Sequence, residues 1–443
     1  MVGGFMLLLG VNWSPWTITR GTSRTSWRPE TGSTGPAGGP RPLLIPGQPR
    51  VPGDRRLMAR VRGAASEGTA HPPDSRPDDP VTTLELFFDL VFVFTITQLT
   101  TFLVRHPTAV GLAQVTIIFG NLWWMFGGYA WLTNAVPPRA TTQRLLILVG
   151  MAAFLVIALA IPDGFGANGV ALGVGYLVVT LVHTGLFLES TDDSVVHAIN
   201  RLGPFNLVTA VLFLAGGFPH GAPRWGLWGA AFVLHWATPF LSSPSGIGLR
   251  LAHFVERHGL ILLIAIGESV VAVGIGLQGR PLTGGLTVTA LLGLAVAAAL
   301  WWMFFDRDDG NAERALAASP PADRAWLALY AFGYTFLVVL TGIVLFAAGV
   351  KLAITAYGQP GSAPTVWFLA AGVSLYVVGL ALLRTILRSG TRVGYLVIGA
   401  IVLLTAPIGL AVSPEGQLGA LAAVLIAGIA TTGHYAGRRR TST

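Results

Sequence analysis

Long apolar runs of about 20 residues recur along this chain from residue 81 onward, and they constrain its fold more than any other feature. A helix rises about 1.5 Å per residue, so each run is long enough to cross a hydrocarbon core of about 30 Å. Only 11% of the residues are charged, against about 25% in soluble domains. Because backbone groups in lipid must be paired within the protein, the sequence predicts an all-α polytopic membrane helix bundle.

We expect about 12 transmembrane helices joined by short connections rich in Pro and Gly. Their expected ranges are 82–104, 110–133, 143–162, 169–188, 203–219, 224–241, 259–277, 286–305, 325–349, 365–386, 393–412 and 417–436. Arginines gather in alternate connections, among them Arg139, Arg144 and Arg384, and at the C-terminal end. By the positive-inside rule, this pattern predicts a multi-pass protein of the cell membrane with both termini in the cytoplasm.

Residues 1–81 differ in composition from the rest of the chain. They are rich in Pro, Arg, Gly and Ser and show no sustained apolar periodicity. Such a segment buries too little apolar surface to offset its ordering entropy, so we expect a disordered cytoplasmic tail. A translation start further along, for example at Met58, is an alternative that would remove most of this tail.

The pentapeptide Leu-Trp-Trp-Met-Phe occurs twice, at 122–126 and at 300–304. In each case it falls in the second helix of a set of six expected helices. We therefore predict two six-helix halves, 82–242 and 250–437, related by duplication. Since six is an even number, the two halves would have the same orientation and form a parallel repeat. Recurrence of an ordinary interfacial aromatic patch is the alternative explanation.

Acidic residues interrupt two of the apolar runs. Glu85 and Asp89 are four residues apart, so they share one face of a helix, and Glu268 lies in the first helix of the second half. Asp89 and Glu268 both lie about 8–9 residues into their runs, roughly 12–14 Å deep. A charge facing lipid costs at least about 2.5–3.5 kcal/mol, so we expect both acids to face one hydrated site between the halves.

Two readings of these acids remain open at this stage. They bind a proton or a cation, or they are structural acids bonded to Arg, His or backbone. His253, Glu256 and Arg257 follow at i, i+3 and i+4, which predicts a cluster at the cytoplasmic end of the seventh helix. We expect this cluster to form a gate network in which an ion pair reaches Glu85.

Three stretches, 85–93, 253–260 and 267–269, resemble the hallmark blocks of the bacterial low temperature requirement protein A family. The similarity extends over residues 82–437 and leaves out the tail, which is longer than the lead-in usual in the family. The resemblance implies a bacterial multi-pass membrane protein that is linked to growth in the cold. It implies importance for the acidic and basic residues of these blocks without assigning them roles.

Further candidates come from the aromatic and histidine residues. The Trp pairs either stack on an organic substrate or anchor the helices, and two histidines within the apolar runs either relay protons or are packed in the core. These substrate-facing candidates are Trp123, Trp124, Trp301, Trp302, His183 and His235. We expect no metal and no cofactor, because neither metal-ligand spacing nor a nucleotide or phosphate-loop motif occurs. The chain has no Cys, which excludes disulfides and thiolate catalysis.

The net charge of +8 does not indicate nucleic-acid binding, because the arginines of the apolar region lie at the ends of helices, where membrane topology explains them. The leading hypothesis is a secondary transporter, not an enzyme, that couples a small solute or ion to a proton or cation through intramembrane carboxylates. A membrane-embedded lipid-modifying enzyme and a non-catalytic component that supports the bilayer in the cold are the alternatives. The expected partners of the protein are the lipid bilayer, a proton or cation, and the solute.

Overall fold

The structure is a computed structural model that describes residues 80–243, 248–306 and 308–440, with the backbone alone from 432 to 440. The predicted tail at 1–81 lies outside the described residues except for its last two. Every regular element in the described part of the chain is a helix. The helices are α3 (Thr83–Arg105), α4 (Ala109–Ala135), α5 (Thr141–Ala160), η1 (Ile161–Asp163), α6 (Gly169–Leu188), α7 (Asp193–Gly216), α8 (Ala222–Leu241), α9 (Leu251–Gly276), α10 (Gly284–Phe305), α11 (Asp308–Ala318), α12 (Pro321–Ala328), η2 (Leu329–Tyr334), α13 (Thr335–Thr355), α14 (Ala363–Ile386), α15 (Val393–Leu403), α16 (Ala406–Ala411) and α17 (Pro414–Arg440).

Eleven helical segments in the described part of the chain are long and apolar enough to cross a membrane. The helix α8 has a similar length but is less apolar, since it carries Arg224 and His235. The predicted all-α membrane bundle is therefore confirmed. The largest difference from the expected ranges is α7, which begins ten residues before the predicted 203. Asp192 caps its N-terminus, and Pro204 is accommodated inside the helix.

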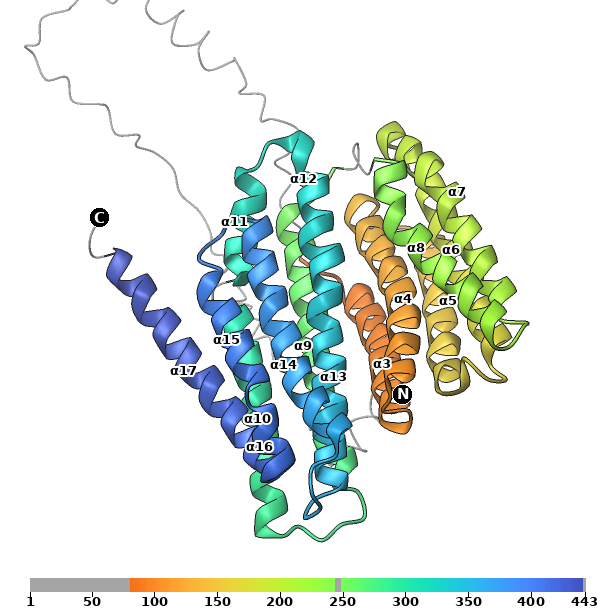
Figure 1. The fold of residues 1–443 in the computed structure, drawn as a ribbon. Helices are drawn as coiled ribbons and strands as arrows, with labels where there is room; N and C mark the ends of the chain where they lie inside the picture. The colour runs from red at the N-terminus through yellow and green to blue at the C-terminus, as the bar shows by residue number, and fades with distance from the viewer. Residues whose placement is uncertain (1–79, 244–247, 307, 441–443) are drawn as a thin grey trace, which may run out of the picture. The chain divides into compact units, whose positions relative to one another are not determined.

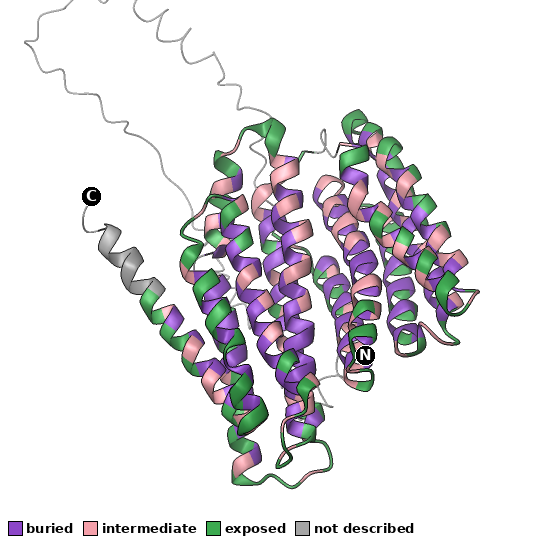
Figure 2. Ribbon diagram, viewed as in Figure 1, coloured by how far each residue is buried: buried purple, intermediate pink, exposed green. Residues whose placement is uncertain are grey.

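The outward faces of several helices are apolar, as a lipid environment requires. Figure 2 shows exposed residues along the helices as well as at their ends. On α5 the exposed large side chains are Leu145, Leu148, Val149, Leu155, Val156 and Leu159. A contiguous apolar face of this kind is rare on a soluble monomer, and in a bilayer it contacts the acyl chains. The helical content and these faces make the chain an integral membrane protein.

The helices of the two predicted halves pack in the same order. In the first, α3 contacts α4 and α5, α5 contacts α6, α6 contacts α7, and α8 contacts both α7 and α4. In the second, α9 contacts α10 and α13, α13 contacts α14, α14 contacts α15, and α17 contacts both α15 and α10. This correspondence supports duplication, which stays a prediction for the ranges 82–242 and 250–437.

The two sets of helices meet mainly where α3 and α4 contact α9 and α13. Figure 1 shows α9 and α13 between α3 and α4 on one side and α10, α14 and α15 on the other. The closest packing within the second set is between α13 and α14. There a Cβ at Gly342 would lie 2.7 Å from the carbonyl oxygen of Gly372, so only glycine lets the two backbones approach this closely.

Candidate functional site

The helices α3 and α9 are neighbours that run in the same direction. Near the start of both helices Glu85 contacts His253, and further along both helices Thr97 contacts Glu268. Residue numbers therefore rise together along the two helices. Polar side chains of α3 face those of α9 at two levels, and the C-terminal end of α4 completes the first of these levels.

Glu85 is fixed at the beginning of α3 by a capping box. Its backbone N–H donates to the hydroxyl of Thr82 at 3.3 Å, and its Oε2 accepts from the Thr82 backbone N–H at 2.9 Å. The Thr82 hydroxyl donates to the same Oε2 at 2.8 Å. These bonds satisfy free N–H groups of the first turn and hold the carboxylate in one orientation towards α9.

Arg257 of α9 bridges the two acids of α3. Its Nη1 donates to Oε1 of Glu85 at 3.3 Å, and its Nη2 donates to Oδ1 of Asp89 at 3.2 Å. Nη1 also donates to the hydroxyl of Thr133 on α4. The guanidinium carbon lies 5.6 Å from the ring centres of both Phe88 and Phe126. The planar, delocalised guanidinium suits this position, where carboxylates contact its edge and aromatic rings its face.

Asn134 sets the tautomer of His253. The Asn134 side-chain oxygen accepts from the backbone N–H of Arg250 at 2.9 Å, and its nitrogen donates to the Arg250 carbonyl at 2.9 Å. The same nitrogen lies 3.2 Å from Nδ1 of His253, so Nδ1 must be the acceptor. The ring proton is then on Nε2, which donates to Oε2 of Glu85 at 3.2 Å. This network therefore contains a neutral imidazole.

The charges of this network do not balance. Glu85 and Asp89 are two carboxylates, and Arg257 is the guanidinium that faces both of them. Asp89 is 0% exposed, and its Oδ2 has no hydrogen-bond partner among the described residues. With a neutral His253, the buried network carries one negative charge too many. One proton on Asp89 would restore neutrality and occupy the unpaired oxygen.

Glu268 forms the second level of the α3–α9 interface. It is 3% exposed, and its Oε2 accepts from the hydroxyl of Thr97 at 2.6 Å. The ammonium group of Lys351 on α13 interacts with the charge of Glu268 and donates to the hydroxyl of Thr101 at 3.5 Å. The carboxylate and the ammonium group thus contact two hydroxyls that lie one turn apart on α3.

A comparison with protein families identifies the family of this chain. Residues 80–430 match the sequence model of the family described as "Bacterial low temperature requirement A protein (LtrA)". The chain belongs to this family. Among curated proteins, this LtrA chain is 26% identical over 279 residues to "Uncharacterized protein RA0937" of Rhizobium meliloti (strain 1021), which covers 60% of the chain and 67% of that relative. No solved structure is significantly similar to it.

The three stretches that resemble the family meet at the α3–α9 interface of this LtrA protein. The stretch 85–93 supplies both acids of the first level, and 253–260 supplies His253 and Arg257. The stretch 267–269 supplies Glu268 at the second level. The predicted ion pair between Arg257 and Glu85 is present in the structure. The functional roles of these residues stay predictions.

Two geometric expectations for the LtrA acids and their neighbours are wrong. Asp89 faces Arg257, whereas Glu268 faces Thr97, eight residues or about 12 Å further along α3. The two acids therefore lie on one interface but at different depths, because Glu268 is much further into α9 than Asp89 is into α3. Glu256 is exposed and separate from the predicted gate network, and its charge interacts with that of Asp309 on α11.

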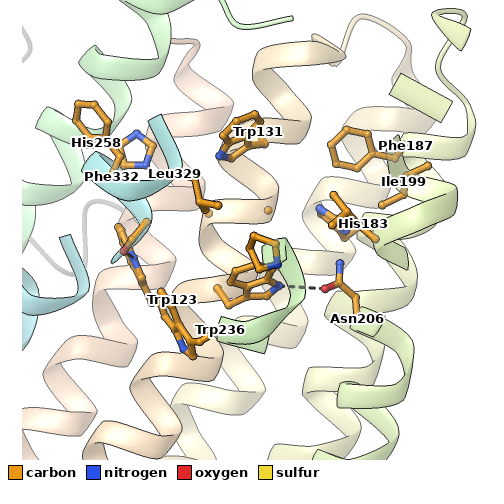
Figure 3. A pocket seen from close by; sticks show the side chains of 16 residues that line it. Trp123, Trp131, His183, Phe187, Ile199, Asn206, Trp236, His258, Leu329 and Phe332 are labelled. Atoms are coloured by element: carbon orange, nitrogen blue, oxygen red, sulfur yellow. Dashed lines mark hydrogen bonds between the residues drawn. The ribbon is translucent and has the colours of Figure 1, made fainter. Parts of the chain in front are cut away.

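A cavity of about 100 Å³ lies among α4, α6, α7, α8, α9 and η2 of the LtrA protein. Its walls are mainly aromatic, and Figure 3 shows Trp123, Trp131 and His183 around it. The side-chain nitrogen of Trp124 donates to the oxygen of Asn206 at 3.0 Å, which orients the amide at the cavity wall. The predicted substrate-facing residues that line this cavity are Trp123, Trp124 and His183.

The remaining substrate-facing candidates do not line this cavity. Trp301 and Trp302 are 39% and 49% exposed and lie on the outside of α10, so the two Trp pairs are not equivalent in their surroundings. His235 is buried, and its Nδ1 lies 3.0 Å from the side-chain oxygen of Asn121. Its ring also stacks on Trp124, which places His235 in the packing layer behind the cavity wall.

Several polar residues of these sites were not among the sequence candidates. Thr133 and Asn134 end α4, and Thr97 lies in the middle of α3. The sequence signal for Thr97 is weak, because Thr95, Thr100 and Thr101 lie in the same stretch. Asn206 and the π-helical segment η2 gave no such signal, because their importance depends on which helices are adjacent.

Proposed function

We propose that this LtrA protein is a secondary transporter that couples movement of a small solute or ion to proton exchange at Asp89. The observation that carries the proposal is the unpaired Oδ2 of Asp89 in a network with one excess negative charge. A fully buried carboxylate without a partner for one oxygen is costly when ionised. Protonation removes this cost, so uptake and release of one proton would shift the energy of the α3–α9 interface.

The interface is also well placed for a mechanical effect. The ion pairs of Arg257 join α3 to α9 and hence one set of six helices to the other. When Asp89 is ionised, Arg257 is held by two carboxylates; when Asp89 is protonated, Glu85 keeps the full ionic interaction. A proton at this position would therefore weaken one of the contacts that hold the two sets of helices together. That is the kind of change that alternating access requires.

Glu268 would be the second acid of the pathway. It lies on the same interface about 12 Å further along the helices, with Lys351 close to it. Under the positive-inside rule, the beginning of α3 and the Arg257 network face the cytoplasm, as do both chain termini. Glu268 and Lys351 then lie nearer the opposite side of the bilayer. The two levels would serve as proton sites that are reached from different sides.

The alternative of a lipid-modifying enzyme receives less support from the geometry. Asp89 and Glu85 are held by Arg257 and His253, and neither lines the cavity. General acid–base catalysis needs a carboxyl group within reach of the substrate. We therefore propose a transport role rather than a catalytic one.

The proposal can be tested with purified protein in liposomes that contain a pH-sensitive dye. A panel of small neutral and charged solutes is added outside, and internal pH is followed. We expect at least one solute to drive a proton flux that Asp89→Asn abolishes, because asparagine cannot exchange a proton. Glu256→Gln is the matched control: Glu256 is an exposed acid on α9, and its flux should equal that of wild type. A flux unchanged in Asp89→Asn, or no proton flux with any solute, would contradict the proposal.

A further inference from the structure

The cavity behind Trp123 has the features of a binding site for a small neutral molecule. Sixteen residues line it, and none of them is Asp, Glu, Lys or Arg. Burying an ion against such walls would leave its charge uncompensated. Tryptophan and phenylalanine rings instead offer flat apolar surfaces that suit an uncharged body.

Polar groups of the wall lack partners. His183 is 3% exposed and lines the cavity. Its ring interacts with the backbone of Gly128, but neither ring nitrogen makes a hydrogen bond of normal geometry with a described residue. Buried polar groups are nearly always hydrogen-bonded, so an exception of this kind requires an explanation. The oxygen of Asn206 is occupied by Trp124, which leaves its amide nitrogen as the donor on that side. Figure 3 shows His183 and Asn206 on the same side of the cavity.

The backbone of α4 is shaped to leave this space open. Gly127 lines the cavity, and a Cβ at this position would meet no atom within 4 Å. At the next residue, Gly128, a Cβ would lie 2.8 Å from Nε2 of His183, so any side chain there would displace the imidazole. The glycine pair thus provides room on one side and admits His183 on the other.

The opposite wall contains an irregular helix. The segment η2 is a π-helix, and Leu329, Phe332 and Gly333 of this segment line the cavity. The carbonyl of Gly333 accepts a hydrogen bond from the side-chain nitrogen of Trp123 at 2.8 Å. Short π-helical segments are energetically unfavourable and occur frequently at functional sites. This observation is independent of the unpaired His183.

The cavity and the Arg257 network share a wall. Trp123 stacks on Phe126 with ring centres 5.1 Å apart, and the Arg257 guanidinium also lies over the Phe126 ring. His258, the next residue after Arg257 in α9, also lines the cavity. A molecule that displaces Trp123 or His258 would therefore act directly on the residues that hold Arg257 in place.

We infer that this cavity binds a small neutral molecule with an amide or hydroxyl group and an apolar body. The polar group bonds to His183 and to the amide nitrogen of Asn206, and the body packs against the tryptophan rings. The volume of about 100 Å³ is below that of a cavity known to hold benzene, which limits the molecule to fewer heavy atoms than the six of benzene. That this molecule is the transported substrate rests on the proposed function. That the cavity binds it does not.

Three probes of five heavy atoms each separate the possible chemistries: propionamide, cyclopentane and tetramethylammonium. Binding to the purified protein is followed by tryptophan fluorescence and by saturation-transfer NMR. We expect propionamide to bind at millimolar concentration and more tightly than either other probe. Stronger binding of tetramethylammonium would overturn the neutral class, and equal binding of cyclopentane would overturn the role of the polar groups. Absence of binding by all three would mean that the cavity holds water only.

Variants then locate the bound probe. His183→Phe removes the hydrogen bonds but keeps a ring, and it should weaken propionamide binding about threefold to tenfold. Gly127→Leu fills the open space and should abolish binding without a change in Tm. This second variant tests the site even if His183→Phe does not fold. Trp301→Phe is the matched control on the outside of α10 and should bind as wild type does. Unchanged binding in Gly127→Leu would overturn the site.

Asp89→Asn separates this inference from the proposed function. The variant should still bind propionamide, because Asp89 does not line the cavity. Loss of flux with retained binding supports both proposals. If the wild type binds propionamide but shows no proton flux, the transport proposal is contradicted and the binding site is not. If it shows proton flux but no binding, the binding site is contradicted and the transport proposal is not.

Discussion

Arg257 and Asp89 lie 168 residues apart in the sequence, yet their side chains meet at 3.2 Å between α9 and α3. This contact joins the helices of the predicted first half to those of the predicted second half. It is also part of a network in which Arg257 serves two carboxylates at once. The stability of the bundle and its proposed proton exchange therefore depend on the same few atoms.

Arg257→Gln should destabilise the protein strongly. The substitution leaves the Glu85 carboxylate buried without a countercharge, and breaking a buried pair in this way costs about 3–5 kcal/mol of unfolding free energy. The measurement is Tm in detergent. Glu256→Gln, at the exposed neighbouring position, should change the unfolding free energy by less than about 0.5 kcal/mol. Equal Tm values for the two variants would show that the network does not stabilise the fold.

Arg257→Lys should fall between wild type and Arg257→Gln. Lysine keeps the charge, but its ammonium group cannot present the planar fork that reaches Glu85 and Asp89 together. We expect a smaller loss of stability, in the same Tm measurement, than in Arg257→Gln. A Tm equal to that of wild type would contradict the importance of the bridging geometry.

Asp89→Asn should be tolerated better than Arg257→Gln, because it removes the excess negative charge and leaves one guanidinium for one carboxylate. In infrared difference spectra, the wild type should show the carbonyl stretch of a buried protonated carboxylic acid. We expect Asp89→Asn to lose this band, and Glu268→Gln to retain it. Persistence of the band in Asp89→Asn would assign the proton to another group.

Asn134→Leu should release the tautomer of His253. In the wild type, ¹⁵N NMR should show the proton on Nε2 of His253, since Nδ1 accepts from Asn134. Loss of the amide also removes its hydrogen bonds to the backbone N–H and carbonyl of Arg250, at a net cost of about 0.5–1.5 kcal/mol for each bond. A proton on Nδ1 in the wild type would contradict the hydrogen-bond assignment around Glu85.

Gly342→Leu should separate α13 from α14. Its Cβ would lie 2.7 Å from the Gly372 carbonyl oxygen, and overpacking of this kind costs about 1–3 kcal/mol or more. Gly267→Leu is the matched control, because a Cβ at Gly267 meets nothing within 4 Å. We expect a lower Tm for the first variant and a nearly unchanged Tm for the second. The opposite order would contradict the packing of α13 on α14.

Much of the fold could be predicted from the chain itself. The apolar runs determine helices because lipid offers no partner for backbone groups, and the predicted range 169–188 coincides with α6. The beginning of α7 could not be predicted, since Asp193, His197 and Arg201 interrupt the apolar signal of its first turns. The three stretches that resemble the family also indicated α3 and α9 as the helices of the site. A charged residue in an apolar run needs a polar partner, so its presence marks a helix that takes part in a buried polar contact.

The partners themselves were decided by tertiary structure. Equal distances from the start of two apolar runs suggested that Asp89 and Glu268 share one depth, but α9 begins earlier than its apolar run, so Arg257 occupies the level of Asp89. The two Trp-Trp pairs have the same local sequence but different surroundings. Trp123 lines the cavity, whereas Trp301 lies on the outside of the bundle. The sequence by itself determined that this protein is a helical membrane bundle with buried acids, since those features follow from local solvation. Which acid meets which base, and where space remains for a ligand, depends on contacts between helices far apart in the chain.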